Sequence, residues 1–197
     1  MVVGSRSRSE RAVEFSVDRP ATDAFATLGL PRRYEIDVPV LEARYRELQR
    51  ALHPDRHIGA GASQRRLSLS KAVEVNEAYR VLKDDLKRAD ALLAHHAIGL
   101  PIDAPAADSE FLMEVMDLRE ALSDAKHRGD RPRVKTLAAT VHALHASTRI
   151  ALVAAFDALS DVPGRVALTQ VSALIGRLKY YTRFLDEVSA IEEEALG

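Results

Sequence analysis

Apolar residues in the first half of this chain recur with the spacing of α-helices. One predicted helix, from about Val40 to Leu52, is apolar on a single side, formed by Leu41, Tyr45, Leu48 and Leu52. A longer helical pattern runs from about Ser63 to His96, with an apolar side made of Leu69, Ala72, Val75, Ala78, Tyr79, Leu82, Leu86 and Leu93. A short helix, Ala24–Leu28, precedes both; Thr22 or Asp23 can cap it and Gly29 can end it. We therefore expect an antiparallel helical hairpin with the short helix packed across it.

The second half shows three more helical patterns, interrupted near Gly129-Asp130 and at Pro163-Gly164. The apolar side of the first contains Phe111, Val115, Leu118, Leu122 and Ala125. The second has the 3-4 spacing of a bundle seam, with Val134, Leu137, Val141, Leu144, Thr148, Ala151 and Ala155. The third contains Val171, Leu174, Leu178, Tyr181, Leu185 and Val188. These patterns predict a three-helix bundle.

The predicted fold class is thus all-α, and the chain divides into four parts. Residues 1–20 are rich in Ser and Arg and are expected to be a disordered extension without an assigned function. Residues 21–98 form the hairpin module, and residues 99–109, with Pro101 and Pro105, form a linker. Residues 110–197 form the bundle.

Composition narrows the classes of function. Lys and Arg number 28 against 29 Asp and Glu, so no global positive field indicates nucleic acid as a partner. The chain has no cysteine, which excludes disulfides, thiolate metal sites and cysteine nucleophiles. No apolar run approaches the roughly 20 residues of a membrane span, and the N-terminus lacks the apolar stretch of a secretory signal. We expect a cytoplasmic protein that does not contact membranes.

His53-Pro54-Asp55 follows the helix that ends at Leu52 and precedes a loop of small residues. Proline fixes its own φ and disfavours helical geometry at the residue before it. His53 and Asp55 should therefore lie on a stiff, solvent-facing corner between two helices. Arg46 and Arg50 are predicted on the outer face of the preceding helix, with Arg44 on its flank.

Two less specific interpretations compete with a binding corner. His53, Asp55 and His57 could form a metal site of a small hydrolase, but Pro54 prevents the two histidines from sharing a helix face, and no further ligand cluster lies nearby in sequence. The three arginines could be an ordinary solvated surface, since Glu42 and Glu47 dilute their charge. We expect no metal, no cofactor and no catalytic residue.

The predicted helix that begins near Phe111 has apolar residues on its wrong side. Leu112, Met113 and Met116 fall about 100° or more from the centre of the buried stripe, together with the acidic residues Asp117, Glu120 and Asp124. Exposed apolar side chains with a charged rim usually mark a partner surface, and methionine adapts well to one. In the last helix Tyr180 is likewise predicted off the seam, whereas Tyr181 is on it.

The first half resembles a J-domain. The resemblance is carried by YRELQRALHPDR, which contains the His53-Pro54-Asp55 tripeptide of that family, by the small-residue loop, and by VNEAYRVLKDDLKRADALL. It implies that the corner and the basic helix face dock on a chaperone. The implied chaperone-binding residues are His53, Pro54, Asp55, Arg44, Arg46 and Arg50.

The whole chain from about Ala24 to Ala190 resembles the iron–sulfur co-chaperone family known as HscB, through RADALLAHHAIGL, FLMEVMDLREAL and RLKYYTRFLDEV. The resemblance implies a non-enzymatic adaptor that stimulates ATP hydrolysis by a DnaK/HscA-type chaperone and delivers the scaffold protein IscU. The implied scaffold-binding residues are Leu112, Met113, Met116, Asp117, Glu120, Asp124 and Tyr180. The chain lacks the N-terminal CxxC motifs of longer members, and Glu42 stands where many J-domains have a basic residue. A general J-domain adaptor for another client, and weak homo-oligomerisation, stay open.

Overall fold

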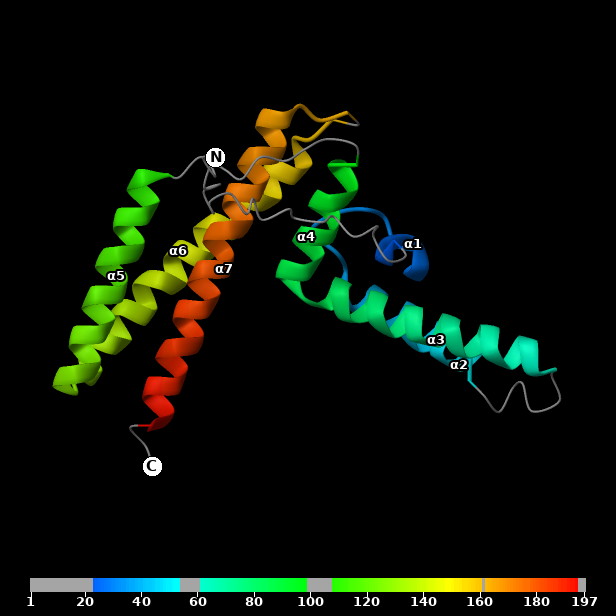
Figure 1. Cartoon of the computed structure of the whole chain (residues 1–197), viewed down its shortest axis with the longest axis horizontal. Coiled ribbons are helices and arrows are strands. Elements are labelled where there is room, and N and C mark those ends of the chain that lie inside the picture. Colours follow the sequence, from blue (N-terminus) through cyan, green and yellow to red (C-terminus); the bar gives the residue numbers. More distant parts are fainter. Residues whose placement is uncertain (1–22, 54–60, 99–107, 161, 195–197) are drawn as a thin grey trace, which may run out of the picture.

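The computed structural model describes residues 23–53, 61–98, 108–160 and 162–194. These residues form seven α-helices and no strand, which confirms the predicted all-α fold. The first four helices form an N-terminal module and the last three a C-terminal bundle, and the α2–α3 pair extends away from the bundle (Figure 1). The predicted 1–20 extension and most of the predicted linker lie outside the described residues.

The N-terminal module begins with two capped helices. In α1 (Ala24–Leu28) the Asp23 carboxylate accepts hydrogen bonds from the backbone N–H groups of Phe25 and Ala26, and Gly29 ends the helix with a φ of 64°. In α2 (Val38–Ala51) Asp37 is the N-cap and Pro39 occupies the first turn, where its missing N–H costs no hydrogen bond. Leu41 of α2 is fully buried, and Tyr45 and Leu48 pack partly buried beside it, as the sequence pattern predicts.

The prediction of one helix from Ser63 to His96 is wrong, because the chain breaks at Asp84. Helix α3 (Ala62–Lys83) ends there and α4 (Asp85–His96) begins. Asp84 is extended, and its carboxylate accepts the backbone N–H of Lys87 at 2.9 Å, which makes it the N-cap of α4. The break turns α4 away from the α2–α3 pair and toward α7 (Figure 1).

Leu69 does not belong to the buried side of α3, where the sequence places it; its side chain is 67% exposed. Ser68 is buried instead, and its hydroxyl donates to the carbonyl of Leu52 at 3.2 Å. This bond ties the end of α2 to α3. From Val75 onward the stripe packs as predicted: Val75, Ala78, Leu82 and Leu93 are buried, and Tyr79 and Leu86 are partly buried.

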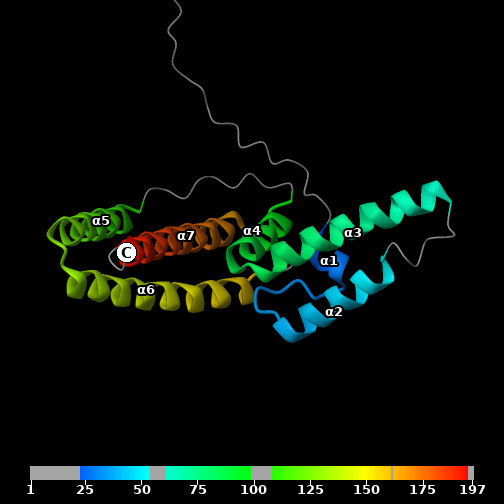
Figure 2. The same cartoon turned by 90° about the horizontal axis from the view of Figure 1, so that it is seen from below.

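The C-terminal bundle consists of α5 (Ser109–Arg128), α6 (Arg131–Asp157) and α7 (Arg165–Glu194). Helix α5 is 20 residues long, whereas α6 and α7 have 27 and 30, so α5 covers only one end of the α6–α7 hairpin. The N-terminal module lies against the other end (Figure 2). By length and composition α6 is the one described helix that could cross a membrane.

Two apolar cores result, and the α6–α7 hairpin contributes to both. The first joins α5 to the hairpin, with Leu118, Leu122, Val141, Tyr181 and Phe184 among its members. The second joins the N-terminal module to the hairpin through residues such as Tyr34, Leu92, Leu152, Phe156 and Ile175. The predicted seam of α6 shifts in this second core: Ala151 is exposed, and the larger Leu152 and Phe156 are buried in its place.

Apolar contacts dominate this joint between module and bundle. The Tyr34 and Phe156 rings stack with centroids 5.4 Å apart, and Leu152 and Leu168 are almost fully buried. Burial of each such side chain contributes about 1.5–3 kcal/mol. Ion pairs at the rim, such as Lys179 with Asp90 at 2.8 Å, are partly exposed and contribute about 0–1 kcal/mol each.

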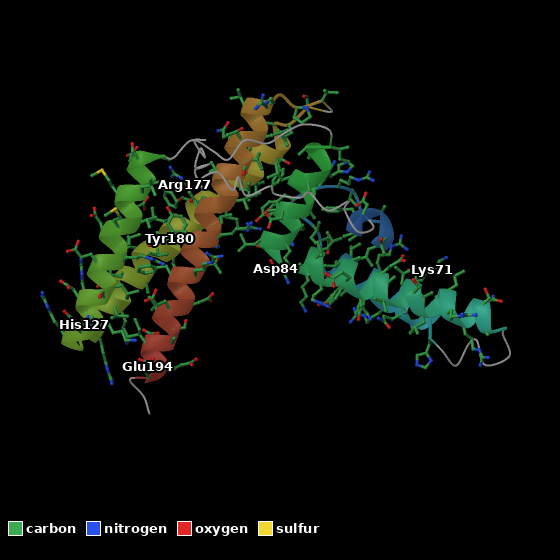
Figure 3. The ribbon with its side chains drawn as sticks, in the orientation of Figure 1. Lys71, Asp84, His127, Arg177, Tyr180 and Glu194 are labelled. Carbon is green, nitrogen blue, oxygen red and sulfur yellow. The ribbon has the colours of Figure 1, made fainter. Side chains whose placement is uncertain are left out.

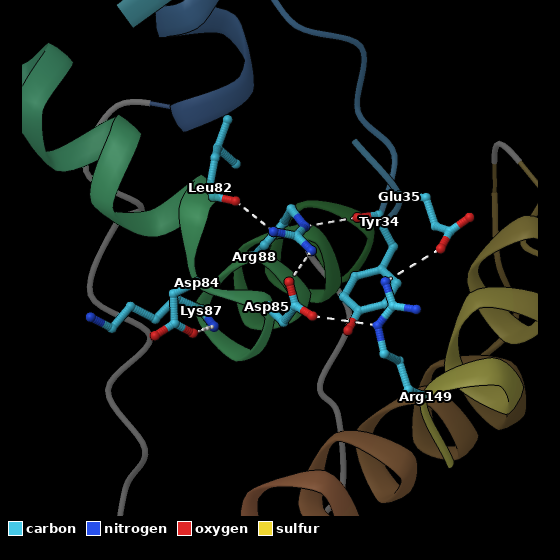
Figure 4. A network of polar contacts seen from close by, with 8 residues as sticks. All are labelled: Tyr34, Glu35, Leu82, Asp84, Asp85, Lys87, Arg88 and Arg149. Carbon is cyan, nitrogen blue, oxygen red and sulfur yellow. Dashed lines mark hydrogen bonds and ion pairs between the residues drawn. The ribbon is translucent and has the colours of Figure 1, made fainter. Parts of the chain in front are cut away.

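Arg88 is a buried charge beside this joint (Figure 4). Its guanidinium donates to the carbonyl of Tyr34 at 2.7 Å and to that of Leu82 at 2.6 Å, and it pairs with Asp85. The Leu82 carbonyl is one that the end of α3 deprives of an intrahelical partner. Arg149 of α6 reaches the same Asp85 at 3.4 Å, so the network links the two parts of the chain.

Candidate functional site

The arginine face of α2 lies opposite its packed side. Tyr45 stacks on Tyr79 of α3 with ring centroids 4.0 Å apart, and its hydroxyl donates to Asn76 at 3.0 Å. This contact fixes the rotation of α2, so that Arg46 and Arg50 face solvent.

Each arginine of this face interacts with another residue of α2. The Arg50 side chain donates a hydrogen bond to the carbonyl of Arg46 at 3.2 Å. Arg44 pairs with Glu47 at 3.1 Å, and Arg46 pairs with Glu42 at 3.9 Å. Both pairs are largely exposed, so water and salt screen them, and a partner's carboxylate can compete for the guanidinium groups. The face can therefore steer an acidic surface into place.

The corner after α2 is described only at its start. Leu52 is the C-cap of α2, and its N–H donates to the carbonyl of Leu48. His53 follows and is exposed. Pro54, Asp55 and His57 lie outside the described residues. The stiff corner therefore stays a prediction, and the alternative of a metal site formed by His53, Asp55 and His57 is not tested. Among the described residues no three His, Cys, Asp or Glu side chains gather as metal ligands do.

On α5 the buried and exposed faces are separated as the sequence predicts. Leu118, Leu122 and Ala125 are buried against α6 and α7. On the outward side the exposed fractions are 49% for Leu112, 66% for Met113 and 69% for Met116. The same side continues with exposed carboxylates, those of Asp117, Glu120 and Asp124. The arrangement is an apolar patch with an acidic border.

Tyr180 of α7 is half-buried and points toward α5 (Figure 3). Its ring meets Phe111 edge-on at 5.8 Å, and its hydroxyl donates to the backbone carbonyl of Val115 at 3.1 Å. Burial raises the pKa of the phenol, which therefore stays neutral at physiological pH. Tyr181 is fully buried, so the two neighbouring tyrosines differ in burial as the sequence predicts. Through its contacts with Phe111 and Val115, Tyr180 also holds α5 in place.

Arg177 is a residue of this region that sequence reasoning missed. Its guanidinium pairs with Asp108, the N-cap of α5, and lies over the Phe111 ring at 4.9 Å from the centroid. The arginine thereby fixes the first turn of α5, from which Leu112 and Met113 project. The sequence can indicate Asp108 as a helix cap, because it directly precedes an apolar stripe. It cannot indicate that Arg177 pairs with Asp108, because the two residues are 69 positions apart.

The two candidate surfaces lie on different arms of the molecule. The arginine face belongs to α2, and the apolar patch belongs to α5 at the opposite end (Figure 1). Partners bound at the two surfaces can therefore be held by one chain at the same time.

Models of two known protein families match the two halves of the chain. The model of the DnaJ domain matches residues 23–90, and that of the HSCB C-terminal oligomerisation domain matches residues 107–189. The co-chaperone protein HscB homolog of Shewanella oneidensis is 34% identical over 174 residues, 87% of this chain and 98% of that protein.

Two solved structures are similar over nearly their whole length. Chaperone HscB from Vibrio cholerae matches with a TM-score of 0.71 and 28% identity, covering 87% of this chain and 98% of that one. Human co-chaperone protein HscB matches with a TM-score of 0.71 over 96% of this chain and 94% of that one; at 21% identity this likeness concerns the fold. The chain thus belongs to the HscB family of J-domain co-chaperones, which serve iron–sulfur cluster assembly.

Proposed function

We propose that this protein stimulates ATP hydrolysis by a DnaK/HscA-type chaperone in the cytoplasm and delivers the iron–sulfur scaffold protein IscU to it. The observation that carries the proposal is the outward patch of Leu112, Met113 and Met116 with its acidic border. A bundle helix has no structural need for three large exposed apolar side chains on one face. A bound protein would remove them from water.

The chaperone is expected to bind the arginine face of α2 and the His53 corner. Three guanidinium groups favour encounter with an acidic surface and fix its register, while the corner that begins at His53, predicted from its proline to be stiff, supplies the specific contact. The sequence has no glycine-rich phosphate-binding loop, so the nucleotide chemistry belongs to the chaperone. Stimulation then requires that this protein bind the hydrolysing state of the chaperone more tightly than its other state.

The chaperone half is tested with a single-turnover ATPase assay on the purified chaperone. His53→Gln should abolish most of the stimulation. His127→Gln, an equally conservative change of an exposed histidine at the far end of α5, is the matched control and should stimulate like the wild type. Full stimulation by His53→Gln would remove the chaperone assignment of the corner.

The scaffold half is tested by titration calorimetry with purified IscU. Truncation of a methionine that becomes buried on binding removes about 1.5–3 kcal/mol, so Met113→Ala should weaken binding by about ten- to a hundredfold. Ile150→Ala is the matched control, because Ile150 is 68% exposed on α6 and away from the patch. Tyr180→Ala should also weaken binding. Wild-type affinity in both Met113→Ala and Tyr180→Ala would refute the site.

A further inference from the structure

The turn between α5 and α6 carries a concentration of positive charge. Gly129, at a φ of 63°, ends α5 and lets α6 begin two residues later. From residue 126 to 135 the chain has five cations and one carboxylate, although its total charge is −1; the cations are Lys126, Arg128, Arg131, Arg133 and Lys135. All five are exposed. We call this group the cationic tip.

The three cations of the tip that belong to α6 do not stabilise that helix. Arg131 and Arg133 stand in the first turn of α6, and Lys135 follows directly, where the positive end of the helix dipole repels cations. No acidic residue occupies that turn; Asp130 caps the helix, accepting the N–H of Arg133 at 3.0 Å. The helix dipole opposes cations at this position, and an anionic group of a partner would offset that repulsion.

The cations on the α5 side have only weak partners within the chain. Arg128 contacts Asp124 at 3.3 Å, and Lys126 contacts Glu194 at 3.2 Å. These side chains are at least half exposed, so such pairs exchange readily with a partner's charges.

One cation of the tip, Arg128, lies on the face of α5 that carries the apolar patch, and the other four surround the turn that follows. At 100° per residue, Met113, Asp117, Glu120, Asp124 and Arg128 fall within about 80° of one another, opposite the buried side of the helix. Along this arc Glu110 and Met113 come first, the carboxylates of Asp117, Glu120 and Asp124 follow, and Arg128 comes last. His127, at the far end of α5 in Figure 3, marks where the basic part begins.

We propose that the cationic tip is part of the cargo surface and binds an acidic region of the scaffold protein. The inference rests on the proposed binding of IscU by α5. A cargo that matches the whole face carries a basic region toward Asp117, Glu120 and Asp124, and an acidic region toward the tip. Two charge contacts of opposite sign fix the direction in which the cargo lies along α5, because a reversed cargo would meet like charges at both. A membrane or a nucleic acid fits less well, since the neighbouring carboxylates would repel an extended polyanion.

The test is titration of purified IscU with the triple variant Arg131→Glu, Arg133→Glu, Lys135→Glu in the full-length protein. At an ionic strength of about 0.05 M the affinity should fall at least tenfold, and at about 0.5 M the difference should shrink to about twofold through screening. The melting temperature should stay equal or rise, since the new carboxylates suit the helix dipole. A loss of binding in a protein that is no less stable cannot come from misfolding.

The matched control reverses Arg65, Arg66 and Lys71 near the start of α3, which changes the net charge equally on the other arm and should leave the affinity within twofold. If the tip variant behaves like this control while Met113→Ala loses binding, the inference fails and the proposed function stands. If the wild type does not bind IscU, the proposed function fails. Loss of co-sedimentation with phosphatidylglycerol vesicles in the tip variant, with IscU binding unchanged, would assign the tip to membranes and overturn the inference.

Discussion

The Nε of Arg88 donates a hydrogen bond of 2.7 Å to the carbonyl oxygen of Tyr34, 54 residues earlier in the chain. Arg88 belongs to α4, whereas Tyr34 stands in the loop before α2 and stacks on Phe156 of the bundle. The buried guanidinium thus holds the loop that contacts both parts of the molecule.

Replacing Arg88 with methionine should destabilise the protein by about 3 kcal/mol, since the carbonyls of Tyr34 and Leu82 would lose their charged donor. Urea denaturation of the full-length protein measures the change. Arg80→Gln is the comparison, because Arg80 forms an exposed pair with Glu77 and its loss should cost about 0.5 kcal/mol or less. Equal effects of the two changes would contradict the role given to Arg88.

The joint between module and bundle predicts a second contrast on α6. Leu152 is fully buried and Ile150 is 68% exposed. Leu152→Ala should lower the free energy of unfolding by about 2–5 kcal/mol through lost contacts and a residual cavity. Ile150→Ala should change it by about 0.5 kcal/mol or less. A small effect of Leu152→Ala would mean that the joint contributes little to stability.

Tyr180 should show two separable roles. Tyr180→Phe removes only the hydroxyl, with its hydrogen bond to Val115 and its interaction with Arg119, and should cost about 1 kcal/mol of stability while leaving IscU binding near the wild-type value. Tyr180→Ala also removes the ring contacts with Phe111 and Phe184, so stability and binding should both fall. Calorimetry and urea denaturation on both variants check this. A large loss of affinity in Tyr180→Phe would show that the cargo binds the hydroxyl itself.

The burial of Tyr181 should make the stability of the protein depend on pH in the alkaline range. Burial, and next the Glu114 carboxylate, raise the pKa of this phenol from 10.0 to about 12. Below pH 10.0 the phenol is neutral in both the folded and the unfolded state, and its contribution to stability does not vary. Between pH 10 and about 12 the unfolded chain releases the proton first, so stability falls.

The test compares urea midpoints of the wild type and Tyr181→Phe at about pH 9 and about pH 11. Burial also raises the pKa values of Tyr34 and Tyr180, so both proteins should lose stability at the higher pH. The variant should lose less. Parallel declines would indicate that Tyr181 does not titrate differently in the folded state.

Sequence reasoning located the helices well because their apolar stripes are long and strongly periodic. It placed Leu41 and Tyr45 on the packed side of α2 and Met113 on the outer side of α5, and the structure agrees. Those assignments need only the geometry of one helix. The roles of these residues in binding remain predictions that the experiments above test.

The errors arose where a second element decides the outcome. The break at Asp84 has a local signal, two successive aspartates that suit a helix start, but the apolar stripe continues across it without interruption. The exchange of Ala151 for Leu152 and Phe156 in the seam of α6 follows from the N-terminal module lying against that half of the helix. The apolar pattern of one helix does not show which other element packs on it. The network around Arg88 joins residues that are too far apart in the sequence to be recognised as one group.

The shared α6–α7 hairpin sets the distance between the two proposed binding surfaces, and this distance depends on the number of residues in the two helices. Inserting one residue in the middle of α6 would rotate its halves by about 100° and misalign one of the two cores. Inserting seven residues in each of α6 and α7 would nearly preserve both buried faces and lengthen the hairpin by about 10.5 Å. Such a protein would keep both proposed partner surfaces intact while changing only the distance between them.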